Sequence, residues 1–427
     1  MSLTKKEFIQ LIEKTAFLHD RINGFFVPEQ VQNDEISERN LNKWKEILAK
    51  EREEIFEKRL SFDNLTADTV LSLLGNVRLA DKNNLPRWSY ILEQIINQTK
   101  RTVSEEITSI QKLPRRFIFP DNPVPFEEAF SPFIQVARDE VVKKSGESYK
   151  LADDRVHAVF EHNLLNSLAC LCLKAIHLEF SIFLLNSKAP FESFIDQITD
   201  TEDSEFYSLF IQELLKSSFI NFFNDYPVLA RLVSVHIKLW SEAISEFFLR
   251  FNEDLSEILR FFQNGKEVGK ITGVKPAISD RHNGGRTVIA VTFESDLQLI
   301  YKPRDLSLEE TYFKLLSWFN DHSISLKFKT IKILNRKNYG WAEFVEYLPC
   351  KNEEEGKNYY RRAGQLLCLL YVLGCSDCHM ENIIASGDYP VLVDLETLMQ
   401  SEVRFREDKK YEKRVNLLAS RQFFYSV

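Results

Sequence analysis

The hydrophobic period of the chain changes near residue 266, and this change limits the folds that the chain can adopt. Between residues 155 and 263 apolar residues recur at a spacing close to that of an amphipathic helix. After residue 266 the segments "RTVIAVTF" and "LQLIYK" are rich in β-branched residues and show the two-residue alternation of a strand. They are joined by "ESD" and follow the turn "NGG". Such segments predict a β-hairpin. The sequence therefore predicts an α+β fold, in which a mainly helical region precedes a small β-rich lobe and the beginning of a second helical lobe.

Five regions are predicted along the 427 residues. Residues 1–112 form a helical N-terminal region, because their apolar residues recur at helical spacing. The proline-rich segment 113–126 is a linker, since proline removes backbone donors and breaks helices. A second helical part spans 127–265, the β-rich lobe spans 266–350, and residues 351–427 begin the second lobe.

Composition and charge exclude several classes of protein. The chain has 55 Lys and Arg residues and 63 Asp and Glu residues, which gives a formal net charge of -8. It therefore has no general basic field for nucleic acid. The N-terminal segment "MSLTKKEFIQLIEKTAFLHD" mixes charges into its apolar positions, which excludes a signal peptide and predicts a cytoplasmic protein. The most apolar stretch, 164–185, includes Lys174 and Glu179, and so predicts a buried helix and no membrane span. The six cysteines lie mostly in apolar runs and are expected to be buried and reduced.

The segment "GCSDCHMENII", residues 374–384, fits two incompatible patterns. Cys375, Cys378 and His379 form C-x-x-C-H, the attachment signal of a c-type haem. Asp377 and Asn382 have the D-x-x-x-x-N spacing of a kinase catalytic loop. Covalent haem attachment normally follows export, and the chain shows no export signal, so we expect no haem. The remaining cysteines form no second C-x-x-C pair, so we also expect no zinc in this part of the chain.

The order of several weak signals favours the kinase-like interpretation. Phosphoryl transfer needs a cation on the nucleotide phosphates, oxygen ligands on Mg²⁺ and an acidic group that positions the attacking hydroxyl. Lys302 ends the predicted strand "LIYK", and Asp377 and Asn382 follow a long predicted helix. The strand "ENIIA", the turn "SGDYP" and the strand "VLVDLE" then predict a short hairpin that carries Asp394 and returns the chain toward the metal. Each residue alone is more often a turn-former or a solvated side chain. Together, in this order, they predict a site that binds ATP and Mg²⁺.

The turn before the first hairpin adds two residues that an ordinary kinase does not need. Gly284 and Gly285 allow the backbone to approach a phosphate closely. Asp280 and His282 precede them and indicate either proton chemistry at the phosphate or capping of the hairpin, and the sequence leaves both open. Farther along, Ser307 with a glutamate at position 310 predicts a capping box that opens a helix. That role explains the glutamate better than an ion pair with the strand-end lysine.

Four stretches together resemble one protein family. They are "DYPVLARLV", "DRHNGGRTV", "YKPRDL" and "GCSDCHMENIIASGDYPVLVDLETL", and the resemblance covers at least residues 220–427. It is to the dehydratase domain of class II lanthipeptide synthetases, the LanM type. The resemblance implies a lipid-kinase-like fold that uses ATP and Mg²⁺ to phosphorylate Ser and Thr of a leader-bearing precursor peptide. Elimination of the phosphate then leaves dehydroalanine or dehydrobutyrine.

By matching motif positions, the resemblance also implies roles for individual residues. Lys302 would contact the nucleotide phosphates, and Asp377 would orient or deprotonate the substrate hydroxyl. Asn382 and Asp394 would hold Mg²⁺. The rest of the active site would be completed by Asp280, His282, His379 and Glu396.

Members of this family continue beyond the point that corresponds to Val427, into the remainder of the dehydratase and a zinc-dependent cyclase. We therefore expect a truncated dehydratase that lacks the cyclase and whose activity is incomplete on its own. Its missing C-terminal part is a possible partner. Two alternatives remain: a stand-alone kinase-like phosphotransferase without an elimination step, and a non-catalytic remnant that binds peptide.

Overall fold

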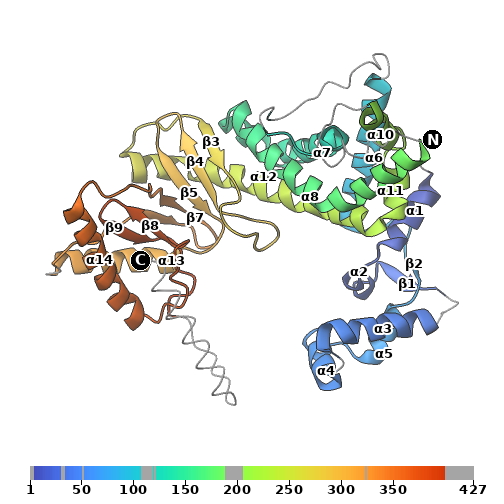
Figure 1. The fold of residues 1–427 in the computed structure, drawn as a ribbon, viewed down its shortest axis with the longest axis horizontal. Helices are drawn as coiled ribbons and strands as arrows, with labels where there is room; N and C mark the ends of the chain where they lie inside the picture. Colours follow the sequence, from blue (N-terminus) through green and yellow to red (C-terminus); the bar gives the residue numbers. More distant parts are fainter. Residues whose placement is uncertain are drawn as a thin grey trace. The chain divides into compact units, whose positions relative to one another are not determined.

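The computed structural model describes residues 4–29, 34–50, 52–106, 119, 122–187, 205–322 and 325–399, and Figure 1 shows its secondary structure along the chain. The chain divides into two compact units. Unit 1 comprises residues 1–146 and 161–246, and unit 2 comprises residues 147–160 and 247–427. Residues 113–118, 120 and 121 of the predicted linker lie outside the described residues, whereas Val124 and Phe126 at its end are buried.

The N-terminal part of unit 1 consists of short helices and one small sheet. Helix α1 begins with a capping box, in which Thr4 and Glu7 each satisfy the other's backbone N–H, and it buries Phe8 and Leu11. Strands β1 and β2 pair antiparallel, with Phe26 opposite Leu79. The elements in order are α1 (Lys5–Lys14), α2 (Leu18–Ile22), β1 (Phe26–Pro28), α3 (Asp34–Ala49), α4 (Glu53–Phe62), α5 (Ala67–Leu73), β2 (Val77–Leu79) and α6 (Arg87–Glu106).

Long helices fill the middle of the chain, as the hydrophobic period predicts. They are α7 (Glu127–Ser145), α8 (Asp154–Asn186), α10 (Glu205–Lys216), α11 (Ile220–Asp225) and α12 (Pro227–Gln263), with a 3₁₀ helix at Gly146–Leu151. Aromatic side chains form much of the core of unit 1; the ring of Phe133, for example, packs edge-on against Phe219 at 4.9 Å between centroids. Most of the aromatic side chains of these helices are buried, as is usual for aromatic residues at helical spacing.

Helix α8 contains the apolar stretch for which the sequence predicts full burial, and this prediction is only partly right. Leu164 and Leu168 are buried, but Leu178 and Leu185 are exposed. Among the residues that the structure describes, α8 is the one helix long and apolar enough to cross a membrane, with a mean hydropathy of 1.9. Length and composition are the only grounds for this, and core helices of soluble proteins meet the same criteria.

Unit 2 contains a five-stranded antiparallel sheet with the order β3-β4-β5-β7-β6. Its strands are β3 (Ile271–Lys275), β4 (Ile289–Phe293), β5 (Gln298–Lys302), β6 (Ile333–Asn335) and β7 (Gly340–Glu343). The predicted hairpin is the β4–β5 pair, in which Ile289 lies opposite Tyr301. Burial alternates along β4, as expected for a strand with one face on a core. The α+β class predicted from the sequence is confirmed.

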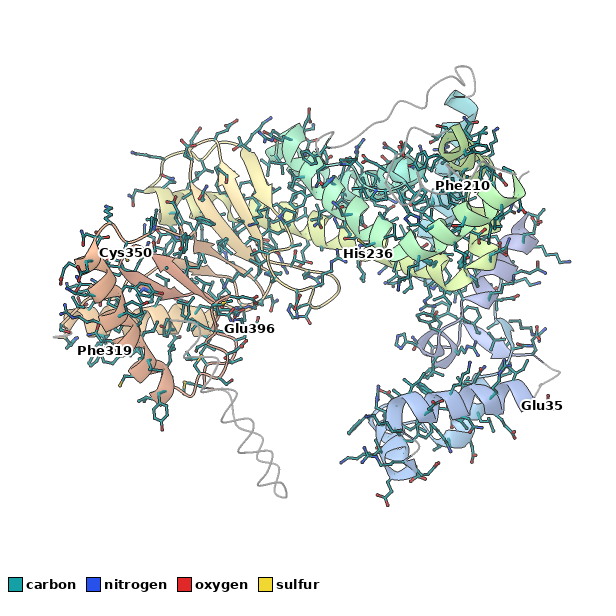
Figure 2. All side chains as sticks on the ribbon, in the orientation of Figure 1. Glu35, Phe210, His236, Phe319, Cys350 and Glu396 are labelled. Atoms are coloured by element: carbon teal, nitrogen blue, oxygen red, sulfur yellow. The ribbon has the colours of Figure 1, made fainter. Side chains whose placement is uncertain are left out.

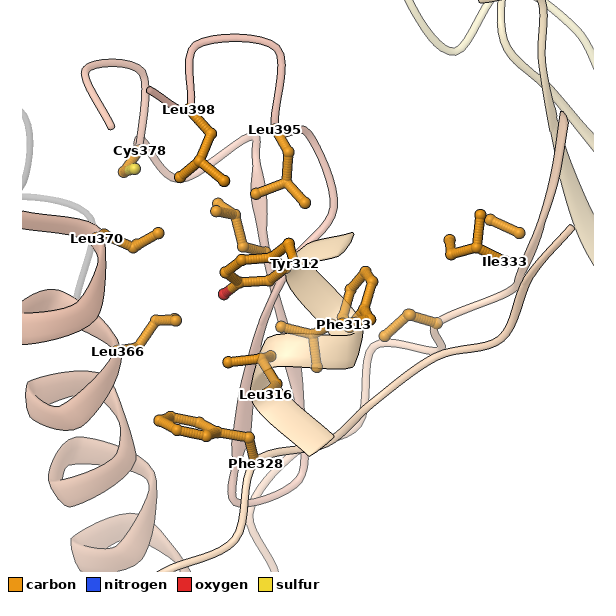
Figure 3. Close-up of a cluster of buried hydrophobic side chains, with 14 of the residues drawn as sticks. Tyr312, Phe313, Leu316, Phe328, Ile333, Leu366, Leu370, Cys378, Leu395 and Leu398 are labelled. Atoms are coloured by element: carbon orange, nitrogen blue, oxygen red, sulfur yellow. The ribbon is translucent and has the colours of Figure 1, made fainter. Parts of the chain in front are cut away.

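A second part of unit 2 packs helices α13 (Ser307–Asp321) and α14 (Glu353–Val372) against a hairpin of β8 (Ile383–Ser386) and β9 (Tyr389–Leu392). Figure 3 shows Tyr312 and Leu316 of α13 among the side chains of this core. From α14 come Leu366 and Leu370, and from the segment after β9 come Leu395 and Leu398. Burial of these two leucines fixes the backbone on both sides of Glu396 and Thr397, of which Glu396 belongs to the candidate site.

Trp341 on β7 is expected to be a main source of stability in unit 2. Its side chain is fully buried, packs against Phe251 and Tyr301, and donates from Nε1 to Asp254 Oδ2 at 2.8 Å. Trp341→Ala should therefore lower the free energy of unfolding by about 3–5 kcal/mol, measured by urea denaturation. The control Trp318→Ala removes a half-exposed ring and should cost less than about 1 kcal/mol. Equal losses in the two variants would contradict this assignment.

Candidate active site

Lys302 lies at the end of β5, where its side chain is buried. Its Nζ donates to the carbonyl oxygen of Val393 at 2.6 Å and lies 3.7 Å from Glu309 Oε1. Burial lowers the pKa of Lys302 below its usual value, and the Glu309 carboxylate opposes this shift. The sequence prediction of a strand-end lysine is confirmed, and the structure connects it directly to the segment that carries Asp394.

The carboxylate beside Lys302 comes from Glu309, and the predicted capping box is wrong. The N-cap of α13 is Leu306, with no side-chain cap, and Ser307 instead donates to Asp305 Oδ1. Glu310 points outward and pairs with Lys314 at 2.5 Å. Because the helix begins one residue earlier than a Ser307 cap requires, Glu309 takes the inward position in its first turn and is buried.

The loop between α14 and β8 brings together the three residues predicted from "DCHMEN". His379 Nε2 lies 3.2 Å from Asp377 Oδ1. Asn382 donates from Nδ2 to the carbonyl oxygen of Asp377 at 2.9 Å, which leaves its Oδ1 as the atom available to a ligand. The backbone N–H of Asp377 donates to Thr397 Oγ1 at 3.1 Å, so the segment after β9 also supports this loop. The side chain of Asp377 is half exposed and accessible to a substrate.

The β8–β9 hairpin places Asp394 and Glu396 next to this loop. The N–H of Val393 donates to the carbonyl oxygen of Asn382 at 2.9 Å, which extends the antiparallel ladder by one pair and sets Asn382 beside the residue before Asp394. The Asp394 carboxylate accepts from the N–H of Glu396 at 3.3 Å. Glu396 is among the residues labelled in Figure 2. The predicted return of the chain toward the catalytic loop is therefore confirmed.

Arg304 joins these acidic residues, and the sequence analysis did not identify it. Its Nη2 lies 3.0 Å from Asp394 Oδ1, its Nε lies 2.9 Å from Glu396 Oε1, and its Nη1 lies 2.6 Å from Glu309 Oε1. Neither oxygen of Glu309 accepts a hydrogen bond of good geometry among the described residues, so this last contact is a pairing of charges. The signal available in the sequence was the arginine two positions after Lys302 in "YKPRD".

The donor set of this region fits a hard divalent cation. The Asp394 carboxylate and the Asn382 amide both offer oxygen, the ligand atom that Mg²⁺ prefers. Among the residues that the structure describes, no group of three or more His, Cys, Asp or Glu side chains is arranged to hold a metal ion. A cation bound by Asn382 and Asp394 would therefore need further oxygens from water or from nucleotide phosphates, as is usual for Mg²⁺.

Asp280, His282, Gly284 and Gly285 lie in the connection between β3 and β4. The backbones of His282 and Arg286 pair across this turn, and both glycines have positive φ, 85° and 87°, which a side chain would disfavour. Asp280 and His282 are exposed. Within the described part of the chain, no hydrogen bond or ion pair joins their side chains to Lys302 or to the acidic residues of the site.

The two cysteines around Asp377 differ in environment. All six cysteines are free thiols, but only Cys172 and Cys378 are buried, so the prediction that most are buried is wrong. Cys378 packs in the core shown in Figure 3. Its thiol donates to Cys375 and lowers the pKa of Cys375 to about 6, although burial opposes the shift. The pKa of Cys378 itself is raised, first by this hydrogen bond and then by burial.

The double variant Cys375→Ser, Cys378→Ser tests whether these thiols have only a packing role. We expect the phosphoryl transfer that the sequence predicts to be largely retained. The free energy of unfolding should fall by about 1–3 kcal/mol, because hydroxyls replace thiols in a partly apolar site. Activity, thermal unfolding and the metal and haem content of parent and variant would be measured. Stoichiometric zinc or haem in the parent that disappears in the variant would contradict the kinase-loop interpretation.

Two comparisons with known proteins agree with the motifs. A family model described as a domain of unknown function, DUF4135, matches residues 226–424, a range that includes every predicted site residue. The Lacticin 481/lactococcin biosynthesis protein LcnDR2 of Lactococcus lactis subsp. lactis is 27% identical over 290 residues. The alignment covers 65% of this chain and 29% of that protein, so the chain spans less than a third of the relative's length.

Proposed function

Because the chain resembles the class II lanthipeptide synthetases in its motifs and in its similarity to a lacticin 481 biosynthesis protein, we propose that it modifies a precursor peptide. The proposed reaction is phosphorylation of Ser and Thr by ATP with Mg²⁺, followed by elimination of the phosphate. The substrate is a ribosomally made peptide with a leader, and the reaction takes place in the cytoplasm. Because the chain spans only part of its relative, both steps of the reaction, phosphorylation and elimination, are proposals for this chain.

One observation carries the proposal: residues from separate segments of the chain meet around Asp394. Lys302 reaches Val393, Asn382 pairs with the same residue, and the loop of Asp377 is supported from just beyond it. This is the set that phosphoryl transfer requires, namely a cation, oxygen ligands and a carboxylate beside a substrate hydroxyl. A structural salt-bridge network would not need the exposed Asp377.

In the proposed phosphorylation each residue acts at a defined atom. Lys302 donates to the nucleotide phosphates through ammonium hydrogens other than the one that it donates to the carbonyl oxygen of Val393. Asp377 accepts the proton of the Ser or Thr hydroxyl, and His379 at 3.2 Å orients that carboxylate. Asn382 and Asp394 would hold the divalent cation, with Glu396 beside them. When bound, this cation neutralises charge on the transferring phosphoryl group.

The proposed elimination needs two further groups. A base removes the Cα proton, the Cβ–O bond breaks, the electron pair forms the Cα–Cβ double bond, and phosphate leaves with its oxygen. An acid or a cation stabilises the departing phosphate. Asp280 and His282 are the proposed candidates, because they are exposed titratable groups in a loop whose two glycines permit close approach to a phosphate.

The test is mass spectrometry of a class II precursor peptide after incubation with the purified chain, ATP and Mg²⁺. Gain of phosphoryl groups followed by loss of phosphate, which leaves each modified residue one water lighter than in the unmodified peptide, supports the proposal. Phosphopeptide that never loses its phosphate would indicate the phosphotransferase without elimination. Peptide binding without ATP binding or any mass change would identify a non-catalytic binding protein and refute the proposed activity.

A further inference from the structure

Arg304 contacts three carboxylates through three different nitrogens, and these contacts differ in strength. Glu309 is only 2% exposed in its side chain, whereas the side chains of Asp394 and Glu396 are 43% and 50% exposed. A buried carboxylate stays ionised only when it is paired, so the Glu309 contact is costly to break. Contacts to half-exposed carboxylates are screened by water and exchange readily. Arg304 can therefore release Asp394 and Glu396 while it stays on Glu309.

The net negative charge of the cluster gives a physical reason for Arg304 to release Asp394 and Glu396. The cluster contains two cations, Lys302 and Arg304, and the acidic side chains Glu309, Asp394 and Glu396, to which the nearby loop adds Asp377. The excess of negative charge attracts a divalent cation. However, Asp394 Oδ1, one of the two carboxylate oxygens that could bind such a cation, is paired with Arg304 at 3.0 Å. If the guanidinium of Arg304 stayed this close to Asp394, it would be repelled by a divalent cation bound to the same carboxylate.

We propose that Arg304 is a positioning residue that holds Asp394 and Glu396 together when no metal is bound and competes with the divalent cation for Asp394. It pivots on Glu309, which keeps the arginine in the site after release. The guanidinium is then free to face the phosphates that accompany the cation, a role suited to its planar set of donors. This inference rests on the proposed role of Asp394 as a metal ligand.

The sign of the effect on metal affinity separates competition from support. If Arg304 only supports the loop, its removal loosens Asp394 and weakens metal binding. If it competes, removal of its charge strengthens metal binding, by roughly three- to ten-fold for a pair of this exposure. Replacement by lysine keeps the charge and should leave the affinity near that of the parent. Only competition predicts tighter binding in the neutral variant.

The experiment is titration of the 427-residue chain with Mn²⁺, without nucleotide, followed by the electron paramagnetic resonance signal of free Mn²⁺. We expect Arg304→Gln to bind Mn²⁺ roughly three- to ten-fold more tightly than the parent and Arg304→Lys to match the parent. The matched control is Arg361→Gln, which removes an exposed arginine on α14 and should not change the affinity. Unchanged or weaker binding by Arg304→Gln would overturn the inference.

Two further variants keep the test decisive. Arg304→Gln combined with Glu309→Gln also removes the buried charge, so it should fold even if the single variant does not, and it should show the same tightening. Asp394→Asn should lose the Mn²⁺ site. If Asp394→Asn binds Mn²⁺ normally, both the proposed metal role and the competition fail. If only the Arg304→Gln effect is missing, the metal role stands and the competition is refuted.

Discussion

Asp394→Asn should reduce Mg²⁺-dependent phosphorylation of a precursor peptide by on the order of 10³-fold, because an amide replaces the anionic ligand of the cation. The structure adds a second reason. Asp394 is one of the carboxylates paired with Arg304, so the variant also removes a contact that orders the segment after β9. The measurement is the initial rate of phosphopeptide formation at saturating ATP, with Mn²⁺ affinity measured in parallel.

The control for Asp394→Asn is Asp321→Asn, the same chemical change at the exposed end of α13. The control should phosphorylate at the parental rate. Circular dichroism should show that both variants are folded, because Leu395 and Leu398 still hold the backbone after β9 in the core. Normal phosphorylation by Asp394→Asn would remove this residue from the metal site.

Asp377→Asn should lower kcat for phosphorylation by about 10²–10⁴-fold, the range expected for loss of a general base. Asn has nearly the shape of Asp, and the backbone contacts of this residue to Thr397 and Asn382 do not involve the carboxylate. The loop should therefore keep its conformation. Initial rates at varied ATP would separate kcat from KM, and KM for ATP should change little.

Metal affinity distinguishes the two aspartates. Asp377→Asn should bind Mn²⁺ as the parent does, whereas Asp394→Asn should not. If Asp377→Asn loses Mn²⁺ affinity instead of kcat, Asp377 is a metal ligand and the proposed division of roles is wrong.

Much of the secondary structure could be predicted from local pattern. The β4–β5 and β8–β9 hairpins and helix α14 lie where the hydrophobic period and the turn residues place them. These signals are local, because the spacing of apolar residues is set by the geometry of a single element. The burial of side chains depends less on local sequence pattern. The apolar run of α8 contains both buried and exposed leucines, since burial depends on what the rest of the fold packs against each face.

In the candidate site, too, some features could be predicted from the sequence and others depended on the rest of the fold. The order of Lys302, Asp377, Asn382 and Asp394 along the chain was sufficient to predict that they act together, because the intervening helix and hairpin return the chain to one place. The structure confirms the hairpin and shows that Lys302 and Asn382 both contact Val393. For Asp280 and His282 the sequence left two roles open, and the described contacts do not join them to the other residues.

The sequence by itself determined the α+β class, the succession of elements and the residue types that phosphoryl transfer requires. Only the tertiary structure decided which acidic residue pairs with the cations. Glu309 and Glu310 are adjacent, and a shift of one residue at the start of α13 turns one inward and the other toward Lys314. Likewise Arg304 meets Asp394 and Glu396 from 90 or more residues away. Such contacts depend on packing between distant segments, which no local pattern encodes.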